Sequence, residues 1–186
     1  MNNFTMVDLC SKALNKIGAS EIVSFDEGTP EAEFSRSIYP VLKHKLLSSF
    51  PWSFATEIKR LNKIVIEDVE AEFSNCYLLP SDFIRAVKIS SKLPYKIIGD
   101  KLFTDATGVI LTYISDVDEC RFSSAFVSAF IYAIAAELSV SLLDDVTKFN
   151  LLYRLYTSEL REARFLDSMQ ESPKKFNDFS LIDVRF

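Results

Sequence analysis

The feature that most constrains the fold is a long apolar segment from Phe126 to Leu143, interrupted only by Ser128, Glu137, Ser139 and Ser141. Its length is marginally sufficient for a helix that crosses a membrane. Glu137 well inside the segment, the three serines and the lack of basic flanks favour instead a helix buried in a protein core. The sequence therefore predicts a buried core helix and no membrane span.

The N-terminal segment has the pattern of a short helix from Thr5 to Ile17. Thr5 and Asp8 have the spacing of a helix N-cap and its acidic partner three positions later. Gly18 supplies the left-handed residue that commonly ends a helix. The first residues lack the basic start and the apolar stretch of a signal peptide, so synthesis in the cytoplasm is expected.

Two further helices are indicated by apolar residues three and four positions apart. The pair Thr29-Pro30 marks the start of one. Its expected apolar face continues to Phe50 through Ala32, Phe34, Ile38, Val41, Leu42, Leu46 and Leu47. Pro40 lies inside this helix and is expected to kink it, because proline lacks the backbone donor and crowds the preceding turn. The other helix begins at residues 144–145 and runs to about residue 170.

From Phe54 to about Tyr113 the pattern changes to short runs of β-branched and aromatic residues. Gly99-Asp100, between two such runs, is a signal for a two-residue hairpin turn. We therefore expect one small antiparallel sheet that forms a compact insertion. Its predicted strands are 63–66, 76–79, 84–89, 95–98, 101–104 and 109–114.

Taken together, these patterns predict an α+β protein that is mainly α. The expected architecture is an antiparallel helical bundle with a small antiparallel β-sheet insertion and an extended C-terminal tail. Residues 1–53 would form the N-terminal helices, 54–120 the β-rich insertion, 121–171 two long helices that complete the bundle, and 172–186 the tail. A chain of 186 residues commonly forms one domain, here with an insertion.

Composition excludes several classes of catalytic and binding site. The 21 basic and 26 acidic residues give a net charge of −5, so no excess of positive charge indicates nucleic-acid binding. His44 is the only histidine, which excludes zinc sites built on a histidine pair. The three cysteines are scattered and odd in number, which is typical of a reducing compartment. The glycines are isolated and form no phosphate-binding loop, and we expect neither a cofactor nor a metal.

Two acidic groups, Glu67–Glu72 and Asp116–Glu119, are the remaining candidates for chemistry. The second begins like a calcium-binding loop but lacks the glycine and the final glutamate that such a loop requires. Two carboxylates across a cleft can hydrolyse glycosidic bonds. Solvated loops are the favoured interpretation of both groups. A tail-associated polysaccharide or cell-wall hydrolase that uses a carboxylate pair stays open as the alternative function.

The last residues, after Pro173, alternate aromatic and charged side chains without a helical period. Such a segment cannot bury its apolar side chains by itself, so it either frays or docks on another surface. We therefore predict a protein interface formed by Phe176, Phe179, Leu181, Arg185 and Phe186.

Several short motifs follow one another in a distinctive order and spacing: 13–18, 51–55, 77–85, 95–100 and 109–114. The most specific are the string Pro51-Trp52-Ser53-Phe54-Ala55 and the Y-x-L-P-x-D-x-x-R pattern from Tyr77 to Arg85. Up to about Asp167 the chain thereby resembles tail tubular protein A, the head-to-tail adaptor of short-tailed bacteriophages. It departs from that family at Phe50, where members often have histidine before the Pro-Trp pair.

The resemblance implies a structural virion protein at the head–tail junction, made in the cytoplasm of the bacterial host and without enzymatic activity. It implies a twelvefold ring that binds the portal protein on one face and the tail nozzle protein on the other. DNA would pass through the lumen without sequence-specific binding. A ring of negatively charged subunits suits such passage, because it does not attract phosphates. A generic interaction module with the same helical frame is a further alternative.

Overall fold

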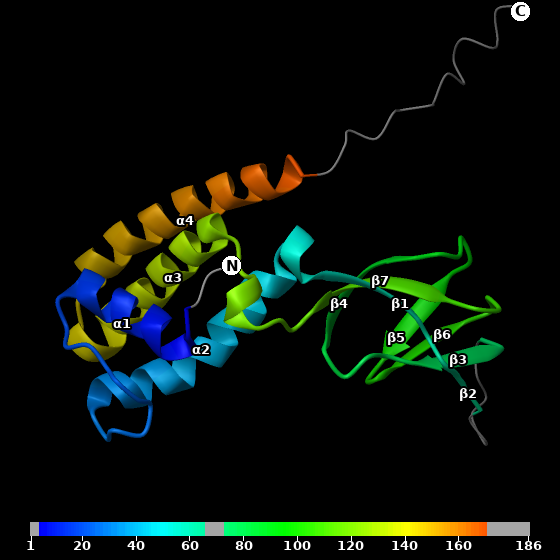
Figure 1. Ribbon diagram of the computed structural model, residues 1–186, viewed down its shortest axis with the longest axis horizontal. Coiled ribbons are helices and arrows are strands. Elements are labelled where there is room, and N and C mark those ends of the chain that lie inside the picture. Colours follow the sequence, from blue (N-terminus) through cyan, green and yellow to red (C-terminus); the bar gives the residue numbers. More distant parts are fainter. Residues whose placement is uncertain (1–3, 66–72, 171–186) are drawn as a thin grey trace, which may run out of the picture.

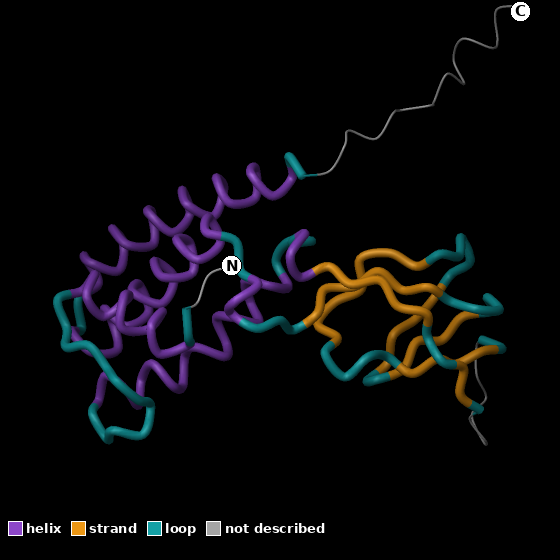
Figure 2. Tube along the Cα trace, viewed as in Figure 1, coloured by secondary structure: helices purple, strands orange, loops and turns teal. Residues whose placement is uncertain are grey.

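The computed structural model describes residues 4–65 and 73–170. Of these described residues, 50% are helical and 20% are in strands, so the fold is α+β and mainly α. Helices and strands are segregated: the helices pack together at one end of an elongated molecule, and the strands form the other end (Figures 1 and 2). We call these the helical part and the β part.

The helical part is organised around one central helix. Its helices are α1 (Met6–Ile17), α2 (Pro30–Ser48), α3 (Ser124–Leu143) and α4 (Val146–Ser168). The other three helices all pack against α3, which is buried around most of its circumference. Among the described residues, α3 alone is long and apolar enough to cross a membrane, but 61% of its most apolar window is buried. This is the position of a core helix.

The predicted caps of α1 and α2 are confirmed. The Asp8 amide donates to Thr5 Oγ1 at 3.2 Å, and Asp8 Oδ2 accepts from the Thr5 amide at 2.8 Å. Gly18 ends α1 with a φ of 79°. Thr29 caps α2, with Pro30 as its first residue.

The expected apolar face of α2 is confirmed for four of its members and wrong for two. The buried members are Ala32, Leu42, Leu46 and Leu47. Phe34 and Val41 are exposed, at 39% and 65%, whereas Tyr39 is buried. The helix includes Pro40, and the kink expected there stays a prediction.

The β part contains seven strands among the described residues. They are β1 (Thr56–Arg60), β2 (Lys63–Ile64), β3 (Asn75–Leu78), β4 (Phe83–Ile89), β5 (Tyr95–Ile98), β6 (Lys101–Thr104) and β7 (Ile110–Ser115). Strand β1 was not predicted from the sequence. It pairs along its whole length with β7, so pairing rather than its own polar sequence makes it a strand.

The expected single sheet is wrong, because the strands form two antiparallel sheets. One has the order β1-β7-β4 and the other β2-β3-β6-β5. Their inner faces share a second hydrophobic core that includes Tyr77 and Leu102 from one sheet and Leu111 and Tyr113 from the other. The hairpin predicted at Gly99-Asp100 is confirmed, since Ile98 pairs with Lys101.

The two parts are joined where the chain leaves α2 and where it enters α3. A short 3-10 helix, η1 (Ser53–Ala55), leads into β1, and a second, η2 (Glu119–Arg121), leads into α3. Trp52 is fully buried at this junction, and its Nε1 donates to the Leu46 carbonyl at 2.9 Å. Its ring contacts Phe126 of α3 edge-on, with centroids 5.0 Å apart. The junction is therefore part of the core of the helical part.

Candidate protein interface

The residues that the sequence singled out for a protein interface are Phe176, Phe179, Leu181, Arg185 and Phe186. They lie outside the described residues, which end at Gln170. The described surface nearest to them along the chain is the C-terminal end of α4. The geometry of that end decides where the following segment begins.

A buried carboxylate fixes the end of α4 against the junction. Asp167 is 6% exposed. Its Oδ2 accepts a hydrogen bond from the Ser53 amide at 2.9 Å, and its Oδ1 accepts one from Ser53 Oγ at 2.7 Å. A buried carboxylate is costly unless its oxygens are hydrogen-bonded, and both oxygens of Asp167 are. The pair therefore ties α4 to η1, 114 residues earlier in the chain.

Arg164, one turn before Asp167, makes a second set of contacts with the same region. Its guanidinium lies over the Phe50 ring, 5.8 Å from the centroid, and its Nη2 donates to Ser49 Oγ at 3.2 Å. A cation over an aromatic ring contributes about 0.5–1 kcal/mol at an exposed site. The contacts of Asp167 and Arg164 together hold the last turns of α4 beside the connection between α2 and η1.

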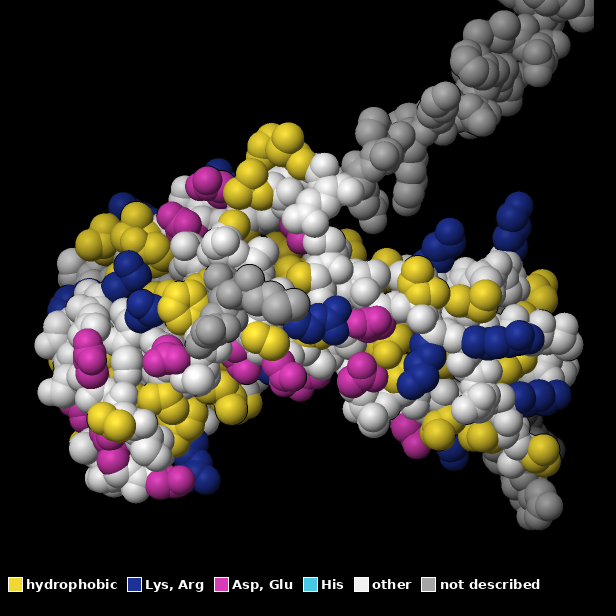
Figure 3. All heavy atoms as spheres, viewed as in Figure 1, with side chains coloured by type: hydrophobic (Ala, Val, Ile, Leu, Met, Phe, Trp, Pro, Cys, Tyr) yellow, Lys and Arg dark blue, Asp and Glu magenta, His cyan; other side chains and the backbone are white. Residues whose placement is uncertain are grey.

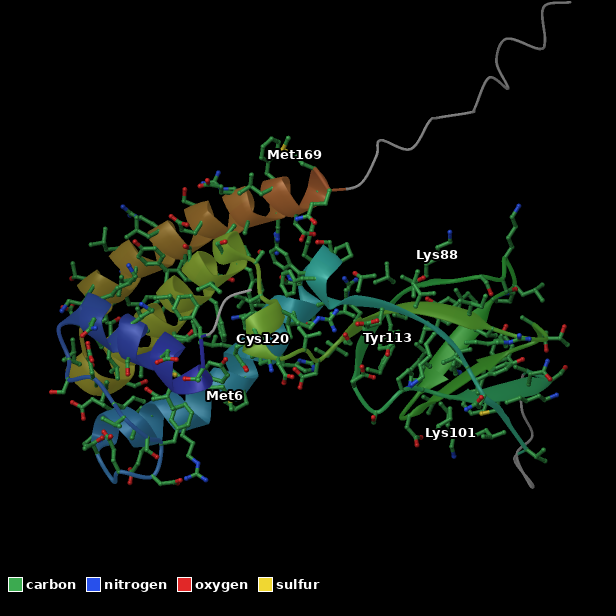
Figure 4. The ribbon with its side chains drawn as sticks, viewed as in Figure 1. Met6, Lys88, Lys101, Tyr113, Cys120 and Met169 are labelled. Carbon is green, nitrogen blue, oxygen red and sulfur yellow. The ribbon has the colours of Figure 1, made fainter. Side chains whose placement is uncertain are left out.

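The opposite face of α4 is apolar and exposed. Leu151, Leu155, Phe165, Leu166 and Met169 are between 40% and 67% exposed, and we call them the α4 outer stripe. Their spacing puts them on one face of the helix, away from its buried face. Hydrophobic side chains gather near the end of α4 in Figure 3, and Met169 points away from the body of the protein in Figure 4.

An apolar stripe of this kind is a feature of interaction surfaces. Single exposed apolar residues are common, whereas a contiguous series along a helix indicates a face that another surface covers. The interval between the two ends of the stripe is polar, with Ser158 and Glu162 on the same face. The stripe is thus two apolar patches, of which the larger adjoins residue 170.

A charged cluster lies at the junction, on the side of α2. Lys43 Nζ is 3.0 Å from Asp116 Oδ1 and 3.2 Å from Glu119 Oε1, and the Tyr39 hydroxyl donates to Glu119 Oε1 at 2.8 Å. Burial and the bond to Glu119 raise the pKa of Tyr39. Burial lowers the pKa of Lys43, but the two carboxylates outweigh it, so that this pKa is raised.

The prediction that 116–119 is a solvated loop is wrong for Glu119, whose side chain is 12% exposed. The turn at η2 directs it toward α2, where Lys43 and Tyr39 bind it. The same residues begin like a calcium-binding loop. Within 4–65 and 73–170, no group of three or more His, Cys, Asp or Glu side chains could hold a metal ion. The other acidic group, 67–72, lies outside the described residues.

Two hollows border these elements. One, of about 320 Å³, lies beside the charged cluster and is lined by Tyr39, Lys43 and His44 among others. The other, of about 640 Å³, is an open cleft of the β part lined by Arg60, Leu79 and Ser81 among others. His44, the only imidazole of the chain, is exposed on α2. Neither lining combines a nucleophile with a bonded base among the described residues.

The two buried cysteines, Cys10 and Cys76, lack the features of a reactive site, whereas Cys120 is exposed. All three are free. Burial raises the pKa of the Cys10 thiol to about 12, so at neutral pH it remains protonated and is a poor nucleophile. Cys76 is buried too, and burial raises its pKa.

The comparisons with known proteins add no relative. A scan against protein-family models gives no match, and no curated protein matches the chain in sequence.

Sequence reasoning missed both polar clusters of the junction. Asp167 lies four residues after Ala163, at the spacing of the buried face of α4, and a carboxylate at such a position needs a partner. That spacing was an available signal. Nothing in the sequence indicated that the partner is Ser53, or that Lys43 reaches Glu119.

Proposed function

We propose that the protein is a structural virion protein, a head-to-tail adaptor that assembles as a ring on the portal of a short-tailed bacteriophage. It closes the DNA-filled head and provides the platform for the tail nozzle. The single observation that carries the proposal is the ordered series of motifs that resembles tail tubular protein A. The most specific of them, residues 51–55, includes Trp52 and Ser53, which join the two parts of the molecule.

The same proposal extends to the finer architecture. In this proposal the four helices form an antiparallel bundle, residues 54–120 form one β-rich insertion, and residues 172–186 form an extended tail. The tail docks on a neighbouring subunit or on the portal through Phe176, Phe179, Leu181, Arg185 and Phe186. Support comes from the apolar patch at Phe165, Leu166 and Met169, which is exposed where the tail begins.

The surface chemistry suits an assembling protein. The larger patch of the α4 outer stripe, at Phe165, Leu166 and Met169, is exposed among the described residues, and an apolar helix face can dock in the groove of a partner. The net charge of −5 is repeated in every copy of a ring. A lumen of that sign lets DNA pass without retaining it, because phosphates are attracted by clusters of Lys and Arg.

The first test measures particle mass by light scattering, for the purified protein alone and after mixing with the portal protein from the same genome. We expect the portal to gain a mass close to twelve subunits. The mass of the free protein then tells whether the ring forms before portal binding. A protein that stays monomeric and ignores the portal would overturn the proposal and favour a generic interaction module.

No observation on the described residues favours the alternative hydrolase. Asp116, which lines the hollow beside the charged cluster, and Glu119 next to it both bind Lys43. Incubation with purified bacterial envelope provides the test. Release of saccharide that is lost in an Asp116→Asn variant would replace the adaptor proposal with the hydrolase.

A further inference from the structure

Charge is distributed unequally between the two parts of the molecule. The described residues of the β part, 56–65 and 73–115, include eight Lys or Arg and four Asp or Glu. Those of the helical part, 4–55 and 116–170, include ten Lys or Arg and fifteen Asp or Glu. The face in Figure 3 shows Lys and Arg spread over the β part and acidic side chains over the helical part. Residues 66–72, outside the described residues, add four acidic side chains that balance this excess of Lys and Arg in number, so individual surfaces matter here rather than totals.

The outer face of the sheet β1-β7-β4 concentrates this positive charge. Residues directly opposite one another in an antiparallel sheet share a face. Ile58 and Lys88 both pair with Thr112, and Arg60 pairs with Ile110. Figure 4 shows Lys88 on the outside of the β part.

Arg85 lies at the base of the same face, opposite Ile114. It is half-buried, and its Nε is buried without a hydrogen-bond partner. We call Ile58, Arg60, Arg85, Lys88 and Ile110 the cationic sheet face.

The cationic sheet face is also apolar and free of acidic residues. Ile58 is 70% exposed and Ile110 is 44% exposed. Glu57, next to Ile58, points to the other face and accepts a hydrogen bond from Arg121. Asp82 accepts from the Tyr113 hydroxyl, and Tyr113 belongs to the inner face. Exposed isoleucines between cations are typical of a protein-binding surface rather than of a nucleic-acid platform, which uses aromatic rings for stacking.

The complementary surface lies at the other end of the molecule. The connection between α1 and α2 and the first turn of α2 form the end of the helical part that is distant from the β part (Figure 1). This segment includes five acidic side chains, exposed or half-buried, and two exposed apolar ones. We call it the acidic end: Glu21, Val23, Asp26, Glu27, Glu31, Glu33 and Phe34.

The charges of the acidic end are mostly uncompensated within the chain. Arg36 forms an ion pair with Asp26 at 2.8 Å. Glu27 accepts hydrogen bonds from the amides of Val23 and Ser24 and from the Thr29 hydroxyl, which lower its pKa and keep it ionised. Val23 is 89% exposed. The acidic end therefore matches the cationic sheet face in both charge and apolar content.

We propose that the cationic sheet face of one copy binds the acidic end of the next copy. The two complementary surfaces lie in different parts of one molecule, too far apart to meet each other. They can therefore only join separate copies, head to tail. Contacts of this kind close into a ring when the rotation between neighbours permits it. The inference rests on the proposed function in one respect: a closed series of these contacts would form the ring proposed above. The contact between two copies can itself be measured without a portal.

Charge reversal on each surface tests the contact. One variant carries Arg60→Glu and Lys88→Glu, and the other carries Glu31→Lys and Glu33→Lys. Each variant alone presents like charges on both surfaces, so we expect its self-association, measured by sedimentation velocity, to fall at least tenfold. In an equimolar mixture every contact of an alternating assembly is again complementary. The mixture should therefore recover most of the wild-type association.

The control for the Arg60→Glu, Lys88→Glu variant carries Lys45→Glu and Arg154→Glu, which make the same change in net charge on exposed residues elsewhere. It should associate like the wild type. The substituted side chains lie at the surface, so each variant should fold. Circular dichroism verifies this for each one. Loss of association in the two variants together with recovery in the mixture supports the contact.

Three results would overturn the inference. Variants that associate like the wild type exclude these surfaces, and a mixture that stays dissociated shows that they do not face one another. Binding of duplex DNA by the wild type that the Arg60→Glu, Lys88→Glu variant loses, without rescue in the mixture, assigns the cationic face to nucleic acid. A ring on the portal that forms equally well in all variants overturns the contact but leaves the adaptor function intact.

Discussion

Trp52 connects the two parts of the molecule through contacts that a smaller side chain cannot make. It is fully buried, lies between the rings of Phe50, Phe54 and Phe126, and donates to the Leu46 carbonyl. We expect Trp52→Ala to lower the free energy of unfolding by roughly 3–5 kcal/mol, from lost burial and the cavity that remains. Urea denaturation measures this change.

Trp52→Phe is the matched variant, because it keeps an aromatic ring and removes the indole donor. It should cost less than the alanine variant, because an aromatic ring still fills most of the site and the Leu46 carbonyl still accepts from the Ser49 amide and hydroxyl. Unfolding of Trp52→Ala at the urea concentration of the wild type would contradict the burial of this residue.

The charged cluster at the junction gives a second prediction, on stability at high pH. The folded-state pKa values of Tyr39 and Lys43 are raised above 10.0 and 10.5, and burial raises the pKa of Tyr113 to about 12. These groups bind their protons more tightly in the folded state, so their stabilisation is complete below pH 10 and is lost as the pH rises. Each contributes up to about 1.4 kcal/mol per pH unit.

Thermal unfolding between pH 8 and pH 11 tests this dependence. Tyr39→Phe should lower the melting temperature near pH 8, because Glu119 loses a donor, and should show a smaller further decrease above pH 10 than the wild type. Tyr95→Phe, at a 41% exposed tyrosine, is the control. Equal slopes for the wild type and Tyr39→Phe would show that Tyr39 does not take part.

At the scale of elements, α4 combines one anchored face with one exposed face. Asp167 and Arg164 hold its end to η1 and to the α2–η1 connection, so the end is fixed by contacts within the described chain. The exposed patch of Phe165, Leu166 and Met169 adjoins the start of the C-terminal segment. Because the end of α4 is anchored on one face and exposed on the other, it gives the following segment a fixed starting point.

This arrangement predicts the result of a truncation. A chain ending before Pro173 retains Asp167, Ser53 and every described contact of the core, so its melting temperature should stay within a few degrees of the full-length value. Assembly on the portal, followed by light scattering, should be weakened. A large decrease in the melting temperature of the isolated subunit would show that the tail packs on its own chain.

At the scale of the whole molecule, the opposite charges of the cationic sheet face and the acidic end make the proposed association sensitive to salt. The Debye length shortens from about 10 Å at 0.1 M salt to about 3 Å at 1 M. We expect the association of wild-type copies to weaken strongly over this range, as measured by sedimentation velocity. Stronger association at high salt would indicate that apolar contacts, such as those of the α4 outer stripe, dominate instead.

How much of this could be predicted depended on the range of the interactions involved. The capping box at Thr5 and Asp8, the left-handed Gly18 and the hairpin at Gly99-Asp100 were predicted, because each is decided by residues at most three positions apart. The buried helix α3 was predicted from its apolar run together with Glu137, the serines and the lack of basic flanks. The buried face of α2 was predicted only in part, since Leu42 and Leu46 are buried as expected but Phe34 and Val41 are exposed.

The sequence by itself determined the local elements and the mainly helical α+β class, because caps, turns and apolar periodicity act within a few residues. Only the tertiary structure decided the rest. It paired the polar strand β1 with β7, divided the expected sheet into two, and brought Asp167 to Ser53 and Lys43 to Glu119. These contacts join residues 50 to 114 positions apart, and their partners are chosen by the packing of whole elements, which no local pattern encodes.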